Sequence, residues 1–192
     1  MANCCTTDYV FIGPKHQLEN FVGELHKRTF HSDRNRITYM PEKDDIISSY
    51  IYPDLYSVSL QTETAWRAMN ETWDEIIKQF PGVSYNYFER EPGLRIYITN
   101  DLDYEIFPWD YWVNSHLDSE ADPALYQKYA VLDGGEPGFE EDEFLDTFRD
   151  ILGDNTLADD DIVQRVKEDF SHAAVSYVEI NRIKRLPNPV KK

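Results

Sequence analysis

The first hundred residues alternate between short apolar runs and longer amphipathic stretches. Thr7–Ile12 is a β-branched and aromatic run that ends at Gly13-Pro14, which predicts a strand. Apolar residues then recur at i, i+3, i+4 and i+7 over 15–27. This spacing predicts an amphipathic helix whose buried face carries Leu18, Phe21, Val22 and Leu25.

The next segments predict a loop, two strands and a second helix. Residues 28–45 are polar and predict a surface loop, whereas Ile46–Tyr52 is apolar and favours a strand. Leu55–Thr62 alternates with period two, which is typical of a half-buried strand. Between Trp66 and Phe80, apolar residues recur at helical spacing, which predicts a helix over 67–80. The residues of this stripe are Trp66, Met69, Trp73, Ile76, Ile77 and Phe80.

Two further strands are predicted at Val83–Glu89 and Leu94–Thr99, and Tyr104–Pro108 is expected to extend the same meander. The order β-α-β-β-α-β-β predicts an α+β, ferredoxin-like sandwich over 1–106, in which two helices cover one face of a mainly antiparallel sheet. Its core is expected to contain Val10, Ile12, Leu18, Phe21, Val22, Leu25, Val58, Leu60, Trp66, Trp73, Ile77, Phe80, Tyr87, Ile96 and Ile98.

The composition changes after residue 100. Residues 101–161 contain 19 Asp and Glu side chains but only two basic ones, Lys128 and Arg149. Apolar stripes predict helices at about 139–152 and 159–171, and Val175–Ile183 favours a strand. We therefore expect an acidic, mainly helical lobe over 107–192, with a C-terminal strand that can return to the sheet.

The net charge of the chain argues against two classes of function, nucleic-acid binding and membrane binding. The 192 residues contain 19 Lys and Arg against 36 Asp and Glu, a net charge of −17. Such a chain is a poor direct ligand for nucleic acid or for an anionic membrane. No apolar run approaches the ~18 residues of a membrane span, and no signal peptide is recognisable, so we expect a cytoplasmic protein. The adjacent Cys4 and Cys5 are expected to be reduced thiols.

Catalytic and metal-binding motifs are not recognisable in the sequence. It contains neither a Gly-x-Ser-x-Gly elbow nor a Walker or Rossmann glycine motif. The five histidines are scattered, and no two of them form an i, i+4 pair. The sequence therefore predicts no catalytic residues, no cofactor and no metal site.

A family resemblance is carried by four short segments: Glu63-Thr-Ala-Trp66, Phe80-Pro-Gly-Val83, Tyr85-Asn-Tyr-Phe-Glu89 and Glu91-Pro-Gly93. Together with the opening Met1-Ala-Asn3, they make residues 1–100 similar to the YubB-type ferredoxin-like domain family of bacterial plasmids, phages and conjugative elements. The resemblance implies a ferredoxin-like fold and a mobile-element setting. It supplies no catalytic residues.

The leading hypothesis is a non-enzymatic accessory or protein-interaction protein of a mobile genetic element. Trp109, Tyr111 and Trp112 either fasten the acidic lobe to the first domain or present an aromatic patch to a partner. The carboxylates of the predicted helix offer a second surface, suited to a basic protein partner, formed by Glu140, Glu143, Asp146 and Asp150.

Two alternatives remain open. An enzyme would use carboxylates at the junction between the aromatic and acidic segments, namely Asp103, Glu105 and Asp110. A DNA mimic, which blocks DNA-binding or restriction proteins, requires six acids to share one elongated face: Glu140, Glu143, Asp146, Asp150, Asp159 and Asp160.

Overall fold

The computed structural model describes residues 4–28, 35–134 and 137–187, and the opening Met1–Asn3 lies outside these ranges. The chain is an α+β protein that divides into two compact units. Unit 1 comprises residues 1–107 and 184–192, and unit 2 comprises residues 108–183. Each unit has its own hydrophobic core, and each is described separately below.

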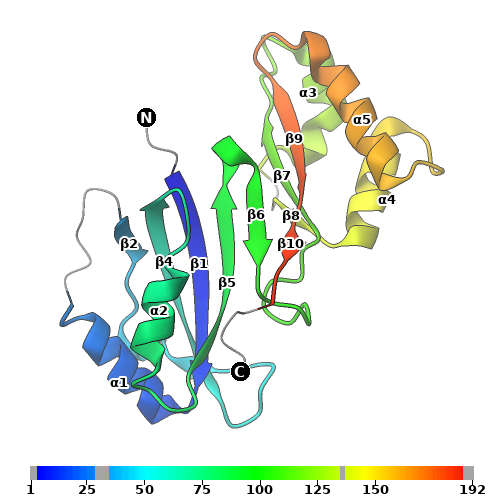
Figure 1. Cartoon of the computed structure of the whole chain (residues 1–192). Coiled ribbons are helices and arrows are strands. Elements are labelled where there is room, and N and C mark those ends of the chain that lie inside the picture. Colours follow the sequence, from blue (N-terminus) through cyan, green and yellow to red (C-terminus); the bar gives the residue numbers. More distant parts are fainter. Residues whose placement is uncertain (1–3, 29–34, 135–136, 188–192) are drawn as a thin grey trace. The chain divides into compact units, whose positions relative to one another are not determined.

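Among the described residues, unit 1 contains a mixed sheet of seven strands (Figure 1). The order along the sheet is β10-β6-β5-β1-β4-β2, and the short β3 also pairs with β4. Only β10 and β6 run parallel; the other pairs are antiparallel. The strands are β1 (Cys4–Gly13), β2 (Asn35–Tyr39), β3 (Ile47–Ser48), β4 (Tyr56–Ala65), β5 (Ser84–Glu91), β6 (Ile96–Thr99) and β10 (Lys184–Arg185).

Two helices, α1 (Lys15–Leu25) and α2 (Asn70–Ile77), pack on the same face of this sheet (Figure 1). The predicted first helix is therefore confirmed, and its four predicted core residues are fully buried. Central β1 contributes Tyr9 and Phe11, which meet the fully buried Trp73 at ring-centroid distances of 5.6 Å. These large rings, rather than aliphatic side chains, fill the centre of the core.

Three predicted core residues, Val10, Trp66 and Ile96, lie outside the core of unit 1. The errors at Val10 and Trp66 have a local cause. Val10 is half-buried because β1 turns Tyr9 and Phe11, rather than Val10, toward the helices. Trp66 is 52% exposed, and its φ of 81° places it in the left-handed region. The predicted helix 67–80 begins only at Asn70, so the expected i, i+7 pairing of Trp66 with Trp73 does not form. Ile77, Ile96 and Ile98 are half-buried.

The structure also corrects the predicted loop at 28–45 and two predicted strands, Ile46–Tyr52 and Tyr104–Pro108. Within 28–45, the described residues include β2, an edge strand that the polar sequence around Ile37 concealed. Of Ile46–Tyr52 only β3 is a strand, and Tyr50 is 96% exposed. Tyr104–Pro108 does not extend the sheet, because the Asp101 carboxylate accepts hydrogen bonds from the Ile106 and Phe107 amides and folds the segment into a loop.

Unit 2 packs three helices against a small antiparallel sheet of order β8-β7-β9 (Figure 1). Its core includes the stacked rings of Tyr111 and Phe144, with centroids 4.0 Å apart. The elements are β7 (Tyr111–His116), α3 (Pro123–Tyr129), β8 (Gly138–Phe139), α4 (Glu141–Leu152), α5 (Asp159–Asp169) and β9 (Tyr177–Arg182).

The sequence predicted α4, α5 and β9 correctly, and Gly153 ends α4 with a φ of 68°. It missed α3, β7 and β8, so the expected mainly helical lobe contains a sheet as well. The two ends of unit 2 are neighbours, because the Ile183 amide donates to the Asp110 carbonyl at 2.8 Å. The chain then continues into β10, which pairs with β6 of unit 1.

Candidate functional site

Three predicted partner-binding residues, Glu143, Asp146 and Asp150, lie along one side of α4, and the fourth, Glu140, precedes the helix as its N-cap. All four are exposed, and a spacing of three or four residues places the three helical ones on one stripe. This stripe faces away from Phe144 and Phe148, which α4 buries in the core of unit 2. We call these four carboxylates the α4 acidic stripe.

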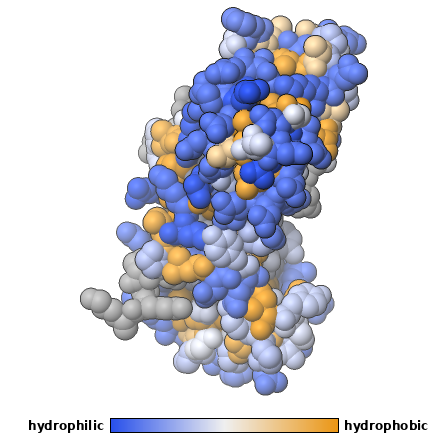
Figure 2. Space-filling view, turned by 90° about the vertical axis from the view of Figure 1, so that its right-hand side faces the viewer, coloured by the Kyte–Doolittle hydropathy of each residue, from blue (hydrophilic) through white to orange (hydrophobic). Residues whose placement is uncertain are grey.

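The carboxylates of the α4 acidic stripe are not neutralised by ion pairs within the described part of the chain. Arg149, on the same helix, donates from Nε to the Leu157 carbonyl at 2.9 Å. In the view of Figure 2, the surface of unit 2, in the upper part, is mostly hydrophilic with scattered apolar residues. The stripe is therefore an exposed negative surface.

Asp159 and Asp160, which the mimicry hypothesis adds to this set, lie at the start of α5 and differ from each other. Asp160 is exposed. Asp159 accepts a hydrogen bond of 2.8 Å from the Tyr111 hydroxyl and a longer contact of 3.4 Å from Arg182. The Tyr111 hydrogen bond lowers the pKa of Asp159 below its ordinary value. Asp159 therefore holds the buried Tyr111 of unit 2, and its charge is already partnered.

The three aromatic candidates are buried or half-buried rather than spread over the surface, and Tyr111 belongs to the core of unit 2. Tyr111 and Trp112 are buried, at 2% and 8% exposure. Trp109 is half-buried and meets Trp112 edge to face at 5.6 Å. Gly138 faces the Trp109 ring so closely that it leaves no space for a side chain. The aromatic segment therefore supports β7 and β8.

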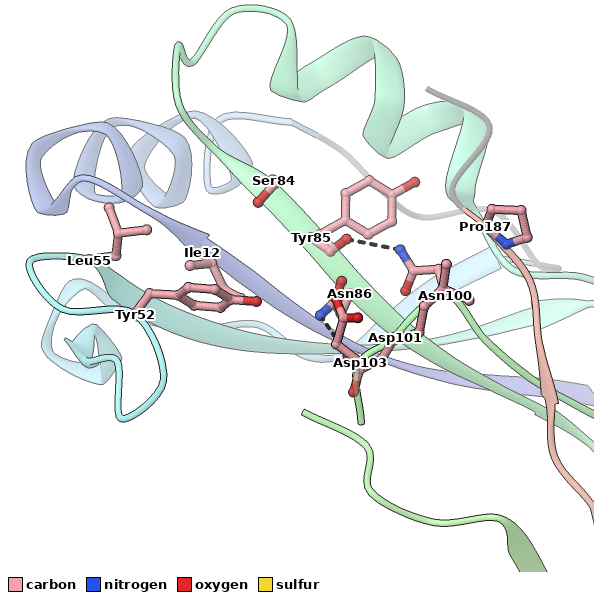
Figure 3. Close-up of a pocket in the computed structure, with 11 residues that line it drawn as sticks. Ile12, Tyr52, Leu55, Ser84, Tyr85, Asn86, Asn100, Asp101, Asp103 and Pro187 are labelled. Atoms are coloured by element: carbon pink, nitrogen blue, oxygen red, sulfur yellow. Dashed lines mark hydrogen bonds between the residues drawn. The ribbon is translucent and has the colours of Figure 1, made fainter. Parts of the chain in front are cut away.

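A cavity of about 440 Å³ lies within unit 1, where β1, β5 and the segments after β3 and β6 converge (Figure 3). The alternation of β5 places Ser84 and Asn86 on the face opposite the core residue Tyr87. Figure 3 shows the Tyr52 ring and the side chains of Asn86 and Asp103 directed toward the same space. The remaining walls are Ile12, Leu55, Tyr85, Asn100, Asp101, Leu102 and Pro187.

A buried hydrogen-bond network holds the floor of this cavity. The Asn100 side chain accepts from the Tyr87 amide at 2.7 Å and donates to the Tyr85 carbonyl at 3.1 Å. Asp101 is 3% exposed, and its Oδ2 accepts from two backbone amides at 2.7 Å. Its Oδ1 receives only a long contact of 3.4 Å from Asn86 (Figure 3). This oxygen therefore retains accepting capacity beside the cavity.

Three carboxylates surround the Tyr52 hydroxyl. The hydroxyl donates a hydrogen bond to Glu105. This bond, followed by partial burial and the negative charges of Glu105, Asp101 and Asp103, raises the pKa of Tyr52 to about 12. The hydrogen bond to Glu105 is the largest cause of this rise, and the nearby negative charges add to it because anions oppose ionisation of a phenol.

The three carboxylates proposed for an enzyme belong to different units of the chain. Asp103 and Glu105 are exposed on the loop of unit 1, whereas Asp110 belongs to unit 2 and accepts from the Glu141 amide. Within the described ranges, no three Asp, Glu, His or Cys side chains are grouped so as to hold a metal ion. The exposure of Asp103 and Glu105 does not favour a catalytic pair, which needs carboxylates in contrasting, partly buried environments.

A second cavity of about 580 Å³ lies beside α2, near a buried thiol and carboxylate. Glu89 lines it and is 6% exposed; this residue accepts from the Ala68 amide at 3.2 Å and from the Cys5 thiol at 3.5 Å. Burial raises the pKa of Cys5 to about 12, so the thiol remains protonated and unreactive near neutral pH. These two groups satisfy each other and do not form a reactive pair.

Comparison with known proteins gives no assignment: no protein-family model, curated protein or solved structure matches this chain. In the described part of the chain, none of the helices combines the length and the apolar character needed to cross a bilayer. The cavity of unit 1 was not predictable from the sequence, because its lining residues Tyr52, Asn86 and Asp103 are far apart along the chain and share no motif.

Proposed function

We propose that this chain is a non-enzymatic accessory protein that binds a basic protein partner through the α4 acidic stripe. The observation that carries the proposal is the placement of three exposed carboxylates on one face of α4 and a fourth at its N-cap, with no ion pair to neutralise them among the described residues. Such a surface attracts a positively charged partner, accelerates encounter and fixes orientation.

The charge distribution of the two units supports a specific surface rather than uniform acidity. Residues 108–183 contain 19 acidic and 5 basic side chains, a net charge of −14 out of the −17 of the whole chain. In the described part of unit 2, Lys128 is already paired with Asp169, and Arg182 approaches Asp159. Most carboxylates of unit 2 therefore have no basic side chain available within the unit, which leaves their negative charge to attract an external partner.

We also propose that unit 1 is a ferredoxin-like sandwich in a bacterial mobile-element protein that acts in the cytoplasm. The succession β1-α1-β2-β4-α2-β5 with the strand order β5-β1-β4-β2 supports this fold. The strands β3, β6 and β10 are additions to that pattern. The YubB-type resemblance of residues 1–100 supports the setting.

A strict DNA mimic is less well supported than a general acidic interaction surface. Mimicry needs all six acids on one elongated face, but Asp159 is bonded to Tyr111 inside unit 2. The axial rise between stripe residues is ~4.5–6 Å. Four such charges suit a basic protein patch without reproducing a DNA strand.

The proposal is tested by comparing three immobilised proteins as baits in a bacterial lysate at low salt. The first is the natural chain, and the second is the stripe variant E140Q/E143Q/D146N/D150N. The third, a control with the same net charge as the stripe variant, neutralises four exposed carboxylates outside α4: Asp44, Glu120, Asp161 and Glu168.

We expect a basic protein to be retained by the natural chain and the control but lost from the stripe variant. Losing four exposed charge contacts of ~0.5 kcal/mol each predicts roughly thirtyfold weaker binding. Retention of the same proteins by all three baits, or by none, contradicts the proposal.

A further inference from the structure

We propose that the cavity of unit 1 binds a guanidinium group carried on an aliphatic chain. The inference goes beyond the proposed function, because the cavity belongs to unit 1 and the α4 acidic stripe to unit 2. Its volume of about 440 Å³ falls within the ~300–1,000 Å³ of small-ligand sites.

The polar walls of the cavity select for positive charge. Asp101 and Asp103 line it, and Glu105 adjoins it through the Tyr52 hydroxyl. None of the eleven lining residues is basic. Asp101 is the decisive group: its carboxylate is held rigidly by the Ile106 and Phe107 amides, while its Oδ1 has only the long contact with Asn86. This oxygen would form its strongest hydrogen bond with a cationic donor.

The remaining walls favour a planar cation on an apolar stem. The Tyr52 ring offers a face on which a guanidinium can stack. Ile12, Leu55 and Leu102 provide apolar surface for methylene groups. An aromatic face, rigid carboxylate and aliphatic wall together match an arginine side chain better than a compact, strongly hydrated ammonium.

The Arg185 guanidinium, beside the loop that carries Asp101, is engaged outside the cavity. Arg185 donates to the Asp101 and Phe107 carbonyls and stacks over the Tyr104 ring at 3.3 Å from its centroid. It therefore braces the loop that carries the cavity wall, and it is not among the lining residues.

The guanidinium can come from a protein side chain or from a free arginine-like molecule. Titration of the full chain with Nα-acetyl-arginine methylamide and with free L-arginine separates these sources. The side-chain amide resonance of Asn86, which lines the cavity, is a local NMR reporter. Preference for the amide-capped probe assigns a protein side chain, and preference for L-arginine assigns a free ligand; saturable binding of either supports a guanidinium site.

Nα-acetyl-citrulline methylamide is the neutral isostere of the first probe. We expect it to bind at least roughly tenfold more weakly, because a charge-assisted hydrogen bond is lost. Asp103→Asn and Tyr52→Leu are each expected to weaken binding of the cationic probe about three- to tenfold. Asp44→Asn, an equal charge change on an exposed residue outside the cavity, should leave binding unchanged.

The stripe variant should also bind the arginine probe like the natural chain, so the two proposals fail independently. Circular dichroism confirms that each variant is folded before titration. Equal affinity for the arginine and citrulline probes, or no saturable shift of the Asn86 resonance, overturns the guanidinium site.

Discussion

At the scale of residues, tyrosine hydroxyls donate hydrogen bonds to several of the carboxylates that have few cationic partners. Tyr85 donates to Asp74 at 2.8 Å, Tyr111 to Asp159 at 2.8 Å, and Tyr129 to Asp169 at 2.6 Å. Burial, followed by these hydrogen bonds to carboxylates, raises the pKa of all three tyrosines. Because 36 acids face only 19 bases, neutral phenols supply donors where cations are scarce.

Asp122 provides a pH-dependent test of unit 2. Its carboxylate accepts from the amides of Ala174, Val175 and Ser176 at 2.8–3.0 Å, and these bonds hold its pKa below the ordinary value. A depressed folded-state pKa contributes stability above the unfolded value of ~3.9 and loses it as pH falls further. Asp122→Asn should lower the Tm by a few degrees at pH 7, and the difference should shrink below pH 4.

The matched control is Glu120→Gln, which removes an exposed charge two residues away. Thermal unfolding of both variants between pH 7 and pH 3 measures the effect. A deficit of Asp122→Asn that stays constant over this range contradicts the assigned role of the carboxylate.

Some single residues were predictable from the sequence and others were not. Helical spacing identified Trp73 correctly but not Trp66, because a periodic pattern does not reveal a left-handed φ at the end of β4. The α4 acidic stripe was predictable, since its residues follow the period of one helix. The cavity was not, because it depends on the pairing of β1 with β5 and on loops that only the tertiary fold brings together.

At the scale of elements, long periodic segments were predicted and short edge elements were missed. Helices α1, α4 and α5 each bury a clear apolar stripe, so their periodicity is visible. The edge strand β2 has mostly exposed side chains and therefore lacks alternation. Strand β8 is only two residues long, and its position depends on pairing with β7.

Glycine substitutions test the packing of these elements. A Cβ at Gly138 would lie 2.5 Å from ring atoms of Trp109, so Gly138→Ala should destabilise unit 2 by about 1–3 kcal/mol through overpacking. At Gly23 in α1 the nearest atom is 3.9 Å away, so Gly23→Ala should stabilise by about 0.5–1 kcal/mol. Urea unfolding measures both, and equal effects of the same sign contradict this packing.

At the scale of the whole molecule, unit 2 is an insertion between β6 and β10 of unit 1. Its first strand, β7, pairs with its last, β9, so its two chain ends emerge side by side. The two hydrophobic cores share no residue. An inserted segment with adjacent ends and its own core has the anatomy of an independent folding unit.

We therefore predict that residues 108–183 fold when excised from the chain. The fragment should show a helical circular dichroism spectrum and a cooperative thermal transition. Unit 1 should also fold when a short Gly/Ser linker replaces 108–183. A fragment that melts without cooperativity would contradict the independence of unit 2.

The most direct test of the central claim is the salt dependence of binding to the basic protein captured in the lysate experiment. Its affinity for the natural chain, the stripe variant and the equal-charge control is measured by titration calorimetry from 50 to 500 mM salt. Screening over ~10 Å at 0.1 M should weaken the natural chain and the control steeply, while the stripe variant binds weakly throughout with a shallower slope. Equal affinity and equal slope for the stripe variant and the natural chain would contradict the account.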